Sequence, residues 1–97
     1  MDSQILPLPQ PWISGTQHQV TVDVTGAPPG QTVTIDLFRS LPRPDQNLGS
    51  TTANVTSGGN ASATFSVTLS TPGVNVLHCE VTNPNDFDSD SAGTVVT

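Results

Sequence analysis

Alternation of apolar and polar residues dominates the chain from residue 18 onward and predicts β-strands. In the segment 18–25, valines occupy every second position and are separated by Thr or Asp. The same period of two recurs in the segments 31–38 and 61–69, and no long stretch shows the spacing of an amphipathic helix. Turns rich in Gly and Pro separate the segments. The expected strands, in chain order, are 18–25, 31–38, 48–56, 61–69, Pro72–Asn83 and 94–97.

The longest of these segments, Pro72–Asn83, is the expected centre of its sheet. After a Pro-Gly turn, every second residue from Leu77 to Val81 is apolar and the residues between are polar, so one face is apolar. Val74 and Val76 lie in the opposite phase. Either a β-bulge near Val76 or an exposed pair of valines accounts for this change, and the sequence leaves the two open.

Residues 1–16 combine a proline-rich pattern with large apolar side chains. Prolines at positions 7, 9 and 11 fix φ and remove backbone donors, so this stretch is expected to be extended and outside any central strand. A free tail does not ordinarily carry so much apolar surface. We therefore expect this arm either to pack along its own domain or to dock on another subunit. In the second case the partner-binding residues are Ile5, Leu6, Leu8, Trp12 and Ile13.

Six strands of similar spacing, separated by turns and without helices, predict an all-β fold with two antiparallel sheets packed as a sandwich. A chain of 97 residues has the size of one small domain. We expect residues 1–16 to form the extended N-terminal arm and residues 17–97 to form the sandwich.

Charge and composition exclude several classes of function. The net charge is −6, with two Arg and no Lys, so the chain lacks the basic groove that nucleic-acid binding requires. An anionic membrane surface is disfavoured for the same reason, and no run approaches the roughly 20 apolar residues of a transmembrane helix. The N-terminus has neither the basic start nor the uninterrupted apolar core of a signal peptide. A single cysteine excludes an internal disulfide.

The order of motifs from residue 48 onward resembles bacterial immunoglobulin-like repeat domains. A Leu-Gly strand starting at Leu48 is followed by a Gly-Gly turn, an Ala-Thr-Phe strand ending at Phe65 and a turn from Leu69 to Gly73. The long strand and a short Asn/Asp-rich loop complete the order. The resemblance covers about residues 18–97 and implies an immunoglobulin-like sandwich.

Two further segments are similar to strands of immunoglobulin domains. Residues 30–37 look like the second strand, with Leu37 where a cysteine often sits, and residues 77–83 look like the sixth. The first disulfide cysteine, the corner tyrosine and the buried tryptophan after Leu37 are absent, so the antibody-type subfamily is not supported.

An acidic loop is expected near the C-terminus, over residues 83–90. Asp86, Asp88 and Asp90 are alternate carboxylates that could converge on Ca²⁺, the only cofactor that the sequence suggests. The Gly and Glu of an EF-hand loop are absent. The competing interpretation is a solvated acidic loop with Phe87 tucked under the sheet.

The other chemistry-bearing residues point to structure rather than catalysis. Cys79 has no cysteine partner and is expected to be a buried thiol that packs as a small hydrophobe. His78 points to the opposite face of the strand and cannot activate it, while His18 and His78 without further ligands are expected on the surface. Asn54 and Asn60 begin glycosylation sequons, which matter only in a eukaryotic secretory route. No catalytic motif stands out, and we do not expect an enzyme.

The two cations of the chain, Arg39 and Arg43, both lie in a Pro-rich loop, residues 39–47. They are expected either to neutralise local carboxylates such as Asp36 and Asp45 or to anchor an acidic patch on a partner.

The resemblance to immunoglobulin-like repeats implies a spacer, adhesion or display module, a kind of domain also found on tailed-phage virions. We expect a structural protein on the virion surface, such as a capsid decoration protein, which docks on the major capsid protein or another virion subunit through its arm. The alternative is a spacer or adhesin repeat on a bacterial cell surface. The apolar arm also allows a homo-oligomer. A carbohydrate-binding sandwich is disfavoured because only four aromatic residues, Trp12 and three Phe, are available.

Overall fold

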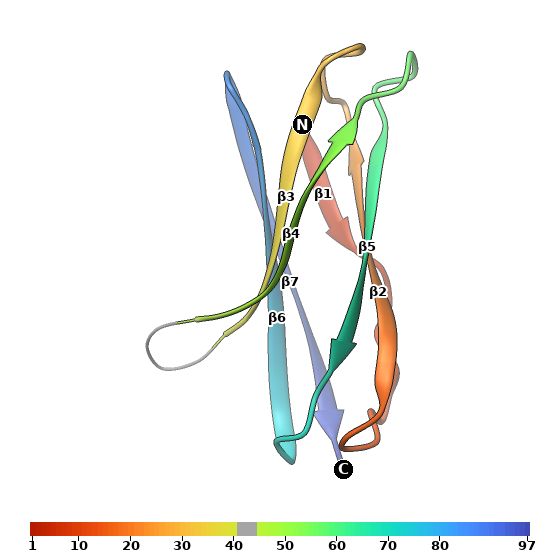
Figure 1. Ribbon diagram of the computed structural model, residues 1–97, viewed down its shortest axis with the longest axis vertical. Coiled ribbons are helices and arrows are strands. Elements are labelled where there is room, and N and C mark those ends of the chain that lie inside the picture. Colours follow the sequence, from red (N-terminus) through yellow and green to blue (C-terminus); the bar gives the residue numbers. More distant parts are fainter. Residues whose placement is uncertain (41–44) are drawn as a thin grey trace.

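A computed structural model describes residues 1–40 and 45–97, and β-strands account for most of them (Figure 1). These residues contain no helix, and therefore none long and apolar enough to cross a membrane. The strands are β1 (Asp2–Ile5), β2 (Gln17–Thr25), β3 (Thr32–Arg39), β4 (Gln46–Asn54), β5 (Ala61–Thr68), β6 (Gly73–Asn83) and β7 (Asp86–Val96).

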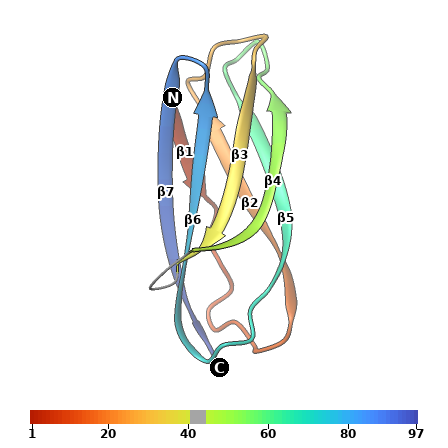
Figure 2. The ribbon, with the colours of Figure 1, turned by 60° about the vertical axis from the view of Figure 1, so that its left-hand side comes forward.

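The strands form two antiparallel sheets that pack face to face as a sandwich (Figures 1 and 2). One sheet has the order β1-β2-β5 and the other the order β4-β3-β6-β7. The second strand therefore pairs with the fifth and the third with the sixth, as in immunoglobulin-like sandwiches. The predicted all-β sandwich of two antiparallel sheets is confirmed.

Side chains at alternate positions of both sheets fill the space between them, as the period-two pattern predicted. Val20, Val22 and Val24 of β2 and Ile35 and Leu37 of β3 belong to one core cluster, and all are almost completely buried. The two sheets are also fitted together at β4 and β5, where the ring of Phe65 lies on the backbone at Gly49. A Cβ atom at position 49 would lie 2.5 Å from Phe65 Cδ1.

Strand β6 keeps one phase throughout, so the predicted alternative of a bulge near Val76 is wrong. Its register with β7 runs without a shift from Gly73 to Asn83. The inward position between Val74 and Val76 is occupied by Asn75, which is buried. Both valines consequently point to solvent, where β6 has passed the last residue that pairs with β3.

Two strands differ from the sequence prediction. The expected acidic loop is largely strand β7, which begins at Asp86 and pairs with β6 along its whole length. Its Asp and Ser residues have low strand propensity, but the backbone ladder to β6 overrides this preference. The first residues of the expected arm form β1, which pairs with β2 from Asp2 to Ile5.

Candidate functional site

Residues 1–14, here called the N-terminal segment, lie along the open side of the sandwich between β2 and β7 (Figure 2). The segment starts in one sheet, where β1 pairs with β2, and ends in the other, where Trp12 pairs with Val96 in parallel. It follows β7 closely: Ser3 bonds to Asp88, Ile5 to Asp90 and Pro9 to Thr94, each 85 residues further on.

Three apolar side chains of the segment belong to the core of their own domain. Ile5 and Leu8 are buried and Trp12 is 0% exposed. The Trp12 ring packs edge-on against His18 at 4.7 Å between centroids, and its Nε1–H donates to the carbonyl oxygen of Thr16. The prediction that these residues form a free docking arm is therefore wrong. Burial in the adjacent core removes these apolar side chains from water, and this stabilises the fold without a partner.

The other two predicted arm residues are more accessible. Leu6 is half-buried, and its backbone N–H donates to the carbonyl oxygen of Thr21. Ile13 is 56% exposed, although its neighbours Trp12 and Ser14 are tied to the backbone of β7. Of the five predicted arm residues, Ile13 is thus the one that is exposed enough to contact a partner.

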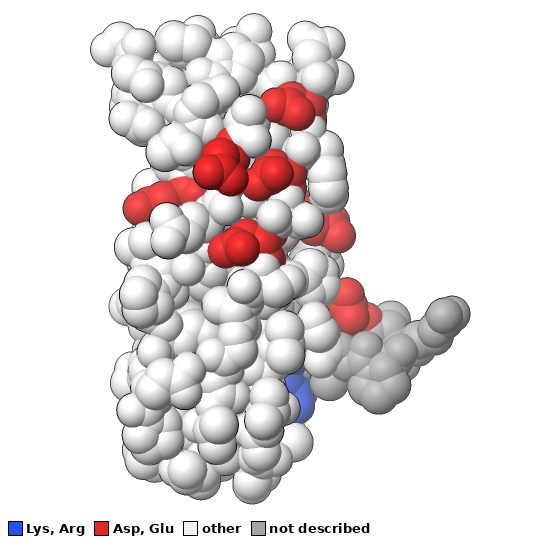
Figure 3. Space-filling model, turned by 180° about the vertical axis from the view of Figure 1, so that it is seen from behind, with Lys and Arg blue, Asp and Glu red and all other residues white. Residues whose placement is uncertain are grey.

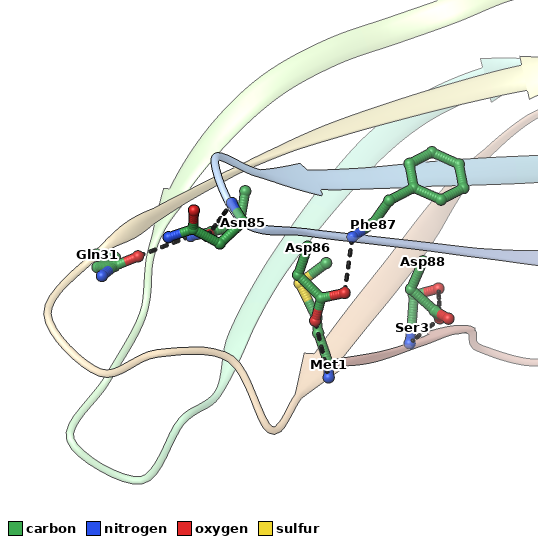
Figure 4. Close-up of polar contacts among 8 residues, drawn as sticks. Met1, Ser3, Gln31, Asn85, Asp86, Phe87 and Asp88 are labelled. Atoms are coloured by element: carbon green, nitrogen blue, oxygen red, sulfur yellow. Dashed lines mark hydrogen bonds and ion pairs between the residues drawn. The ribbon is translucent and has the colours of Figure 1, made fainter.

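The three alternate carboxylates of β7 bind the N-terminal segment, and Figure 4 shows two of them, Asp86 and Asp88. Asp88 Oδ2 accepts from both the backbone N–H and the hydroxyl of Ser3, at 2.7 and 2.6 Å. Asp90 Oδ2 accepts from the backbone N–H of Ile5, and Asp86 Oδ2 lies 3.2 Å from the terminal amine of Met1. Carboxylates at every second position of β7 thereby pair with N–H donors at every second position of the N-terminal segment. These donors have no partner in the ladder between β1 and β2.

The calcium prediction for Asp86, Asp88 and Asp90 finds no support in this geometry. Over residues 1–40 and 45–97, no three His, Cys, Asp or Glu side chains are arranged to hold a metal ion. The competing idea that Phe87 packs under the sheet is wrong, because Phe87 points outward and is 56% exposed.

Hydrogen bonding changes the acidity of these carboxyl groups. The N–H of Phe87 and then the Met1 amine lower the pKa of Asp86, and the hydroxyl and N–H of Ser3 lower the pKa of Asp88. Both groups therefore hold the segment best when ionised. The pKa of the neighbouring Cys79 is raised, chiefly by burial, which fits the predicted inert thiol in the core.

The remaining predicted site residues lie apart from the segment. Arg39 donates from Nε to Asn75 Oδ1 at 2.7 Å and from a terminal nitrogen to Gln46, so its guanidinium binds amide oxygens. Arg43 lies outside the described residues. His78 is partly exposed, stacks on Phe38 and lies 3.3 Å from Asp45, in the other sheet from His18. Asn54 and Asn60 of the two sequons line an open pocket of about 310 Å³.

One end of the sandwich carries an exposed apolar patch that the arm prediction missed. We call Ile13, Val74, Val76 and Val95 the apolar end patch. Val74 lies directly opposite Val95 in the ladder of β6 and β7, and Ile13 follows Trp12 on the next stretch of backbone. These are four of the five large apolar side chains that the described residues expose. The phase of Val74 and Val76 in the sequence was the signal for it.

The apolar end patch lies far from the acidic groups. Residues 12–19, 66–76 and 93–97, which build this end, contain no Asp, Glu, Lys or Arg. Figure 3 shows the carboxylates gathered over the other half of the molecule, whose longest dimension is 41 Å. The protein is thus an acidic body with one end that is partly apolar and built from residues without carboxylate side chains. The Arg39 guanidinium reaches this end at Asn75, which lies between Val74 and Val76 in the sequence.

The chain was compared with protein families and with curated proteins. The chain matches no protein-family model, and a search of curated proteins finds no match.

Proposed function

We propose that this protein is a non-enzymatic structural module of a virion surface, which docks on another virion subunit through its apolar end patch. The proposed docking residues differ from those expected from the sequence. Ile5, Leu8 and Trp12 of the N-terminal segment are buried in the core, so we assign docking to the exposed residues of the patch. The observation that carries the proposal is the clustering of Ile13, Val74, Val76 and Val95 on an end built from residues without carboxylate side chains. Contiguous apolar surface on a soluble domain commonly marks a contact with a protein.

The charge distribution supports a foreign protein as the occupant. The net charge of −6 gives two copies of this chain no electrostatic attraction at this end, and the carboxylates lie away from the patch. A partner surface that is apolar and neutral can approach the patch without burying an unpaired charge. Such a partner would be held by desolvation of the valines and would face no acidic rim.

A charge placed in the patch tests this proposal. Val74→Asp should weaken co-sedimentation with the virion at least tenfold, because a buried carboxylate without a partner opposes association. The matched control is Ser89→Asp on the outer face of β7 at the acidic end, which should leave association unchanged. Equal association of both variants with the particle would rule out the patch as the docking site.

A spacer repeat on a bacterial surface is the second candidate. The first and last residues of the chain lie toward opposite ends of the long axis, a geometry that suits domains joined end to end (Figure 1). In that setting the apolar end patch would contact a neighbouring domain. Recovery of the protein with the cell envelope and not with particles would favour this function.

A further inference from the structure

The N-terminal segment is joined to the rest of the domain by one short turn. Gly15 adopts a φ of +81°, and Thr16 N–H donates to the carbonyl oxygen of Ile13 at 3.0 Å. Gly15 N–H donates to the carbonyl oxygen of Leu69. Strand β2 begins directly afterwards, at Gln17. This turn is the covalent connection between the segment and the domain. The contacts that hold the segment in place are non-covalent, so an identical segment from another chain could make them.

The groove that the segment fills has three distinct parts along β7. At one end Asp86, Asp88 and Asp90 accept from donors at alternate positions of the segment. At the other end Trp12 is buried and its backbone pairs with Val95 and Thr97. Between them the Leu8 side chain is buried, and Thr94 donates to the carbonyl oxygen of Pro9. The groove therefore selects both apolar anchors and their spacing along the peptide.

The prolines of the segment lower the cost of binding it again. Pro7 and Pro9 fix φ at alternate positions, so this stretch of the released segment stays extended. A peptide that is already extended loses less conformational freedom when it enters an extended groove. These prolines also carry no N–H group, so the middle of the segment leaves no backbone donors unpaired at their positions.

We propose that residues 1–14 form an exchangeable strand, and that the groove between β2 and β7 is a binding site for the same segment of a second copy of this chain. Exchange restores every contact of the closed monomer apart from the turn at residues 13–16. The buried Ile5, Leu8 and Trp12 explain why the groove must always be filled. The groove is a different surface from the apolar end patch, which shares only Ile13 with the segment, and the inference does not depend on the patch.

Acid should promote the exchange, because the first part of the groove binds through ionised carboxylates. The groups that face this region are Asp86, Asp88 and Asp90 of β7, the Cys79 thiol of β6 and the terminal amine of the segment itself. Asp2 of β1 is exposed. Asp23 of β2 accepts a hydrogen bond from the Ser62 hydroxyl, outside this region. Protonation of Asp86 and Asp88 weakens their bonds to the segment, while the Trp12 anchor carries no titrating group.

A labelled peptide tests the groove in the full-length protein. The probe is a fluorescent peptide of residues 1–14, incubated with the protein at about pH 2, below the ordinary pKa of Asp, and returned to about pH 7. We expect the peptide to co-elute with the protein, and capture of a Trp12→Asp peptide to be at least tenfold lower. Capture of both peptides to the same extent, or of neither, would overturn the proposal.

Cross-linking tests exchange between whole chains. Gln10 Nε2 lies 2.9 Å from the carbonyl oxygen of Gly93, and both residues are exposed, whereas the native Cys79 is buried. Gln10→Cys and Gly93→Cys chains are mixed, taken through the acid step and treated with a short bismaleimide. We expect covalent heterodimers, and none above background when Ser89→Cys replaces Gly93→Cys. A chain carrying both cysteines shows that the linker spans the gap, and its internal cross-linking without heterodimers in the mixture would refute exchange.

Discussion

The two open sides of this sandwich are closed by different chemistry. Between β1 and β7, carboxylates of one sheet accept hydrogen bonds from the backbone of a strand in the other. Further along the same side, the buried Trp12 side chain completes the closure. Between β4 and β5, the Phe65 ring lies on the bare backbone at Gly49. The first closure depends on charge and on a detachable segment, whereas the second depends on shape. The comparison explains why only the first side is expected to respond to acid.

Loss of the Trp12 side chain should have the largest effect on the first side. Trp12→Ala removes a fully buried ring and leaves a cavity, so the free energy of unfolding should fall by about 3–5 kcal/mol. Chemical denaturation measures this loss. Ile13→Ala, on the exposed neighbour, is the matched control and should change stability by less than about 0.5 kcal/mol. A loss as small for Trp12→Ala would show that the segment does not close the core.

A methyl group at position 49 should disturb the second side by steric overlap. Gly49→Ala places a Cβ atom 2.5 Å from Phe65 Cδ1, and the free energy of unfolding should fall by about 1–3 kcal/mol. The loss should be equal at neutral and acidic pH, because the contact joins uncharged carbon atoms. Gly93→Ala, whose Cβ would meet only the Asn75 oxygen at 3.8 Å, is the control. A Gly49→Ala protein as stable as Gly93→Ala would contradict the packing described for Phe65.

The carboxylate bonds should give the smallest effect and the one that depends on pH. Asp88→Asn should cost about 1 kcal/mol at pH 7, because a neutral amide accepts from Ser3 more weakly than a carboxylate does. The pKa of Asp88 is lowered in the folded protein, so its contribution is complete above about pH 4 and is lost as the pH falls further.

Thermal melting from about pH 7 to about pH 2 measures this dependence. The Tm of the parent protein should fall with acid more steeply than that of Asp88→Asn, and the two curves should converge. Asp2→Asn, at an exposed carboxylate of β1, should follow the parent. Parallel curves for the parent and Asp88→Asn over the whole range would exclude a role for this carboxylate in the closure.

The chain pattern predicted the sandwich well and its N-terminal side poorly. Strands with alternating valines, such as β2, were predicted because one buried face imposes a period of two. The first residues of β7, up to Asp90, were expected to be a loop because they are rich in Asp, yet their carboxylates accept hydrogen bonds from β1. Those donors lie 85 residues away, and no local pattern records that distance.

The amino-acid sequence by itself determined that valine-rich segments would bury one face each and that this acidic chain would build two antiparallel sheets. Only the tertiary structure decided where residues 1–14 go, because their apolar side chains suited a foreign partner as well as the chain's own core. The nearby groove prevails, since an anchor attached by a short turn is always close to it. The structure also decided which valines stay exposed, because that depends on where β3 ends beside β6.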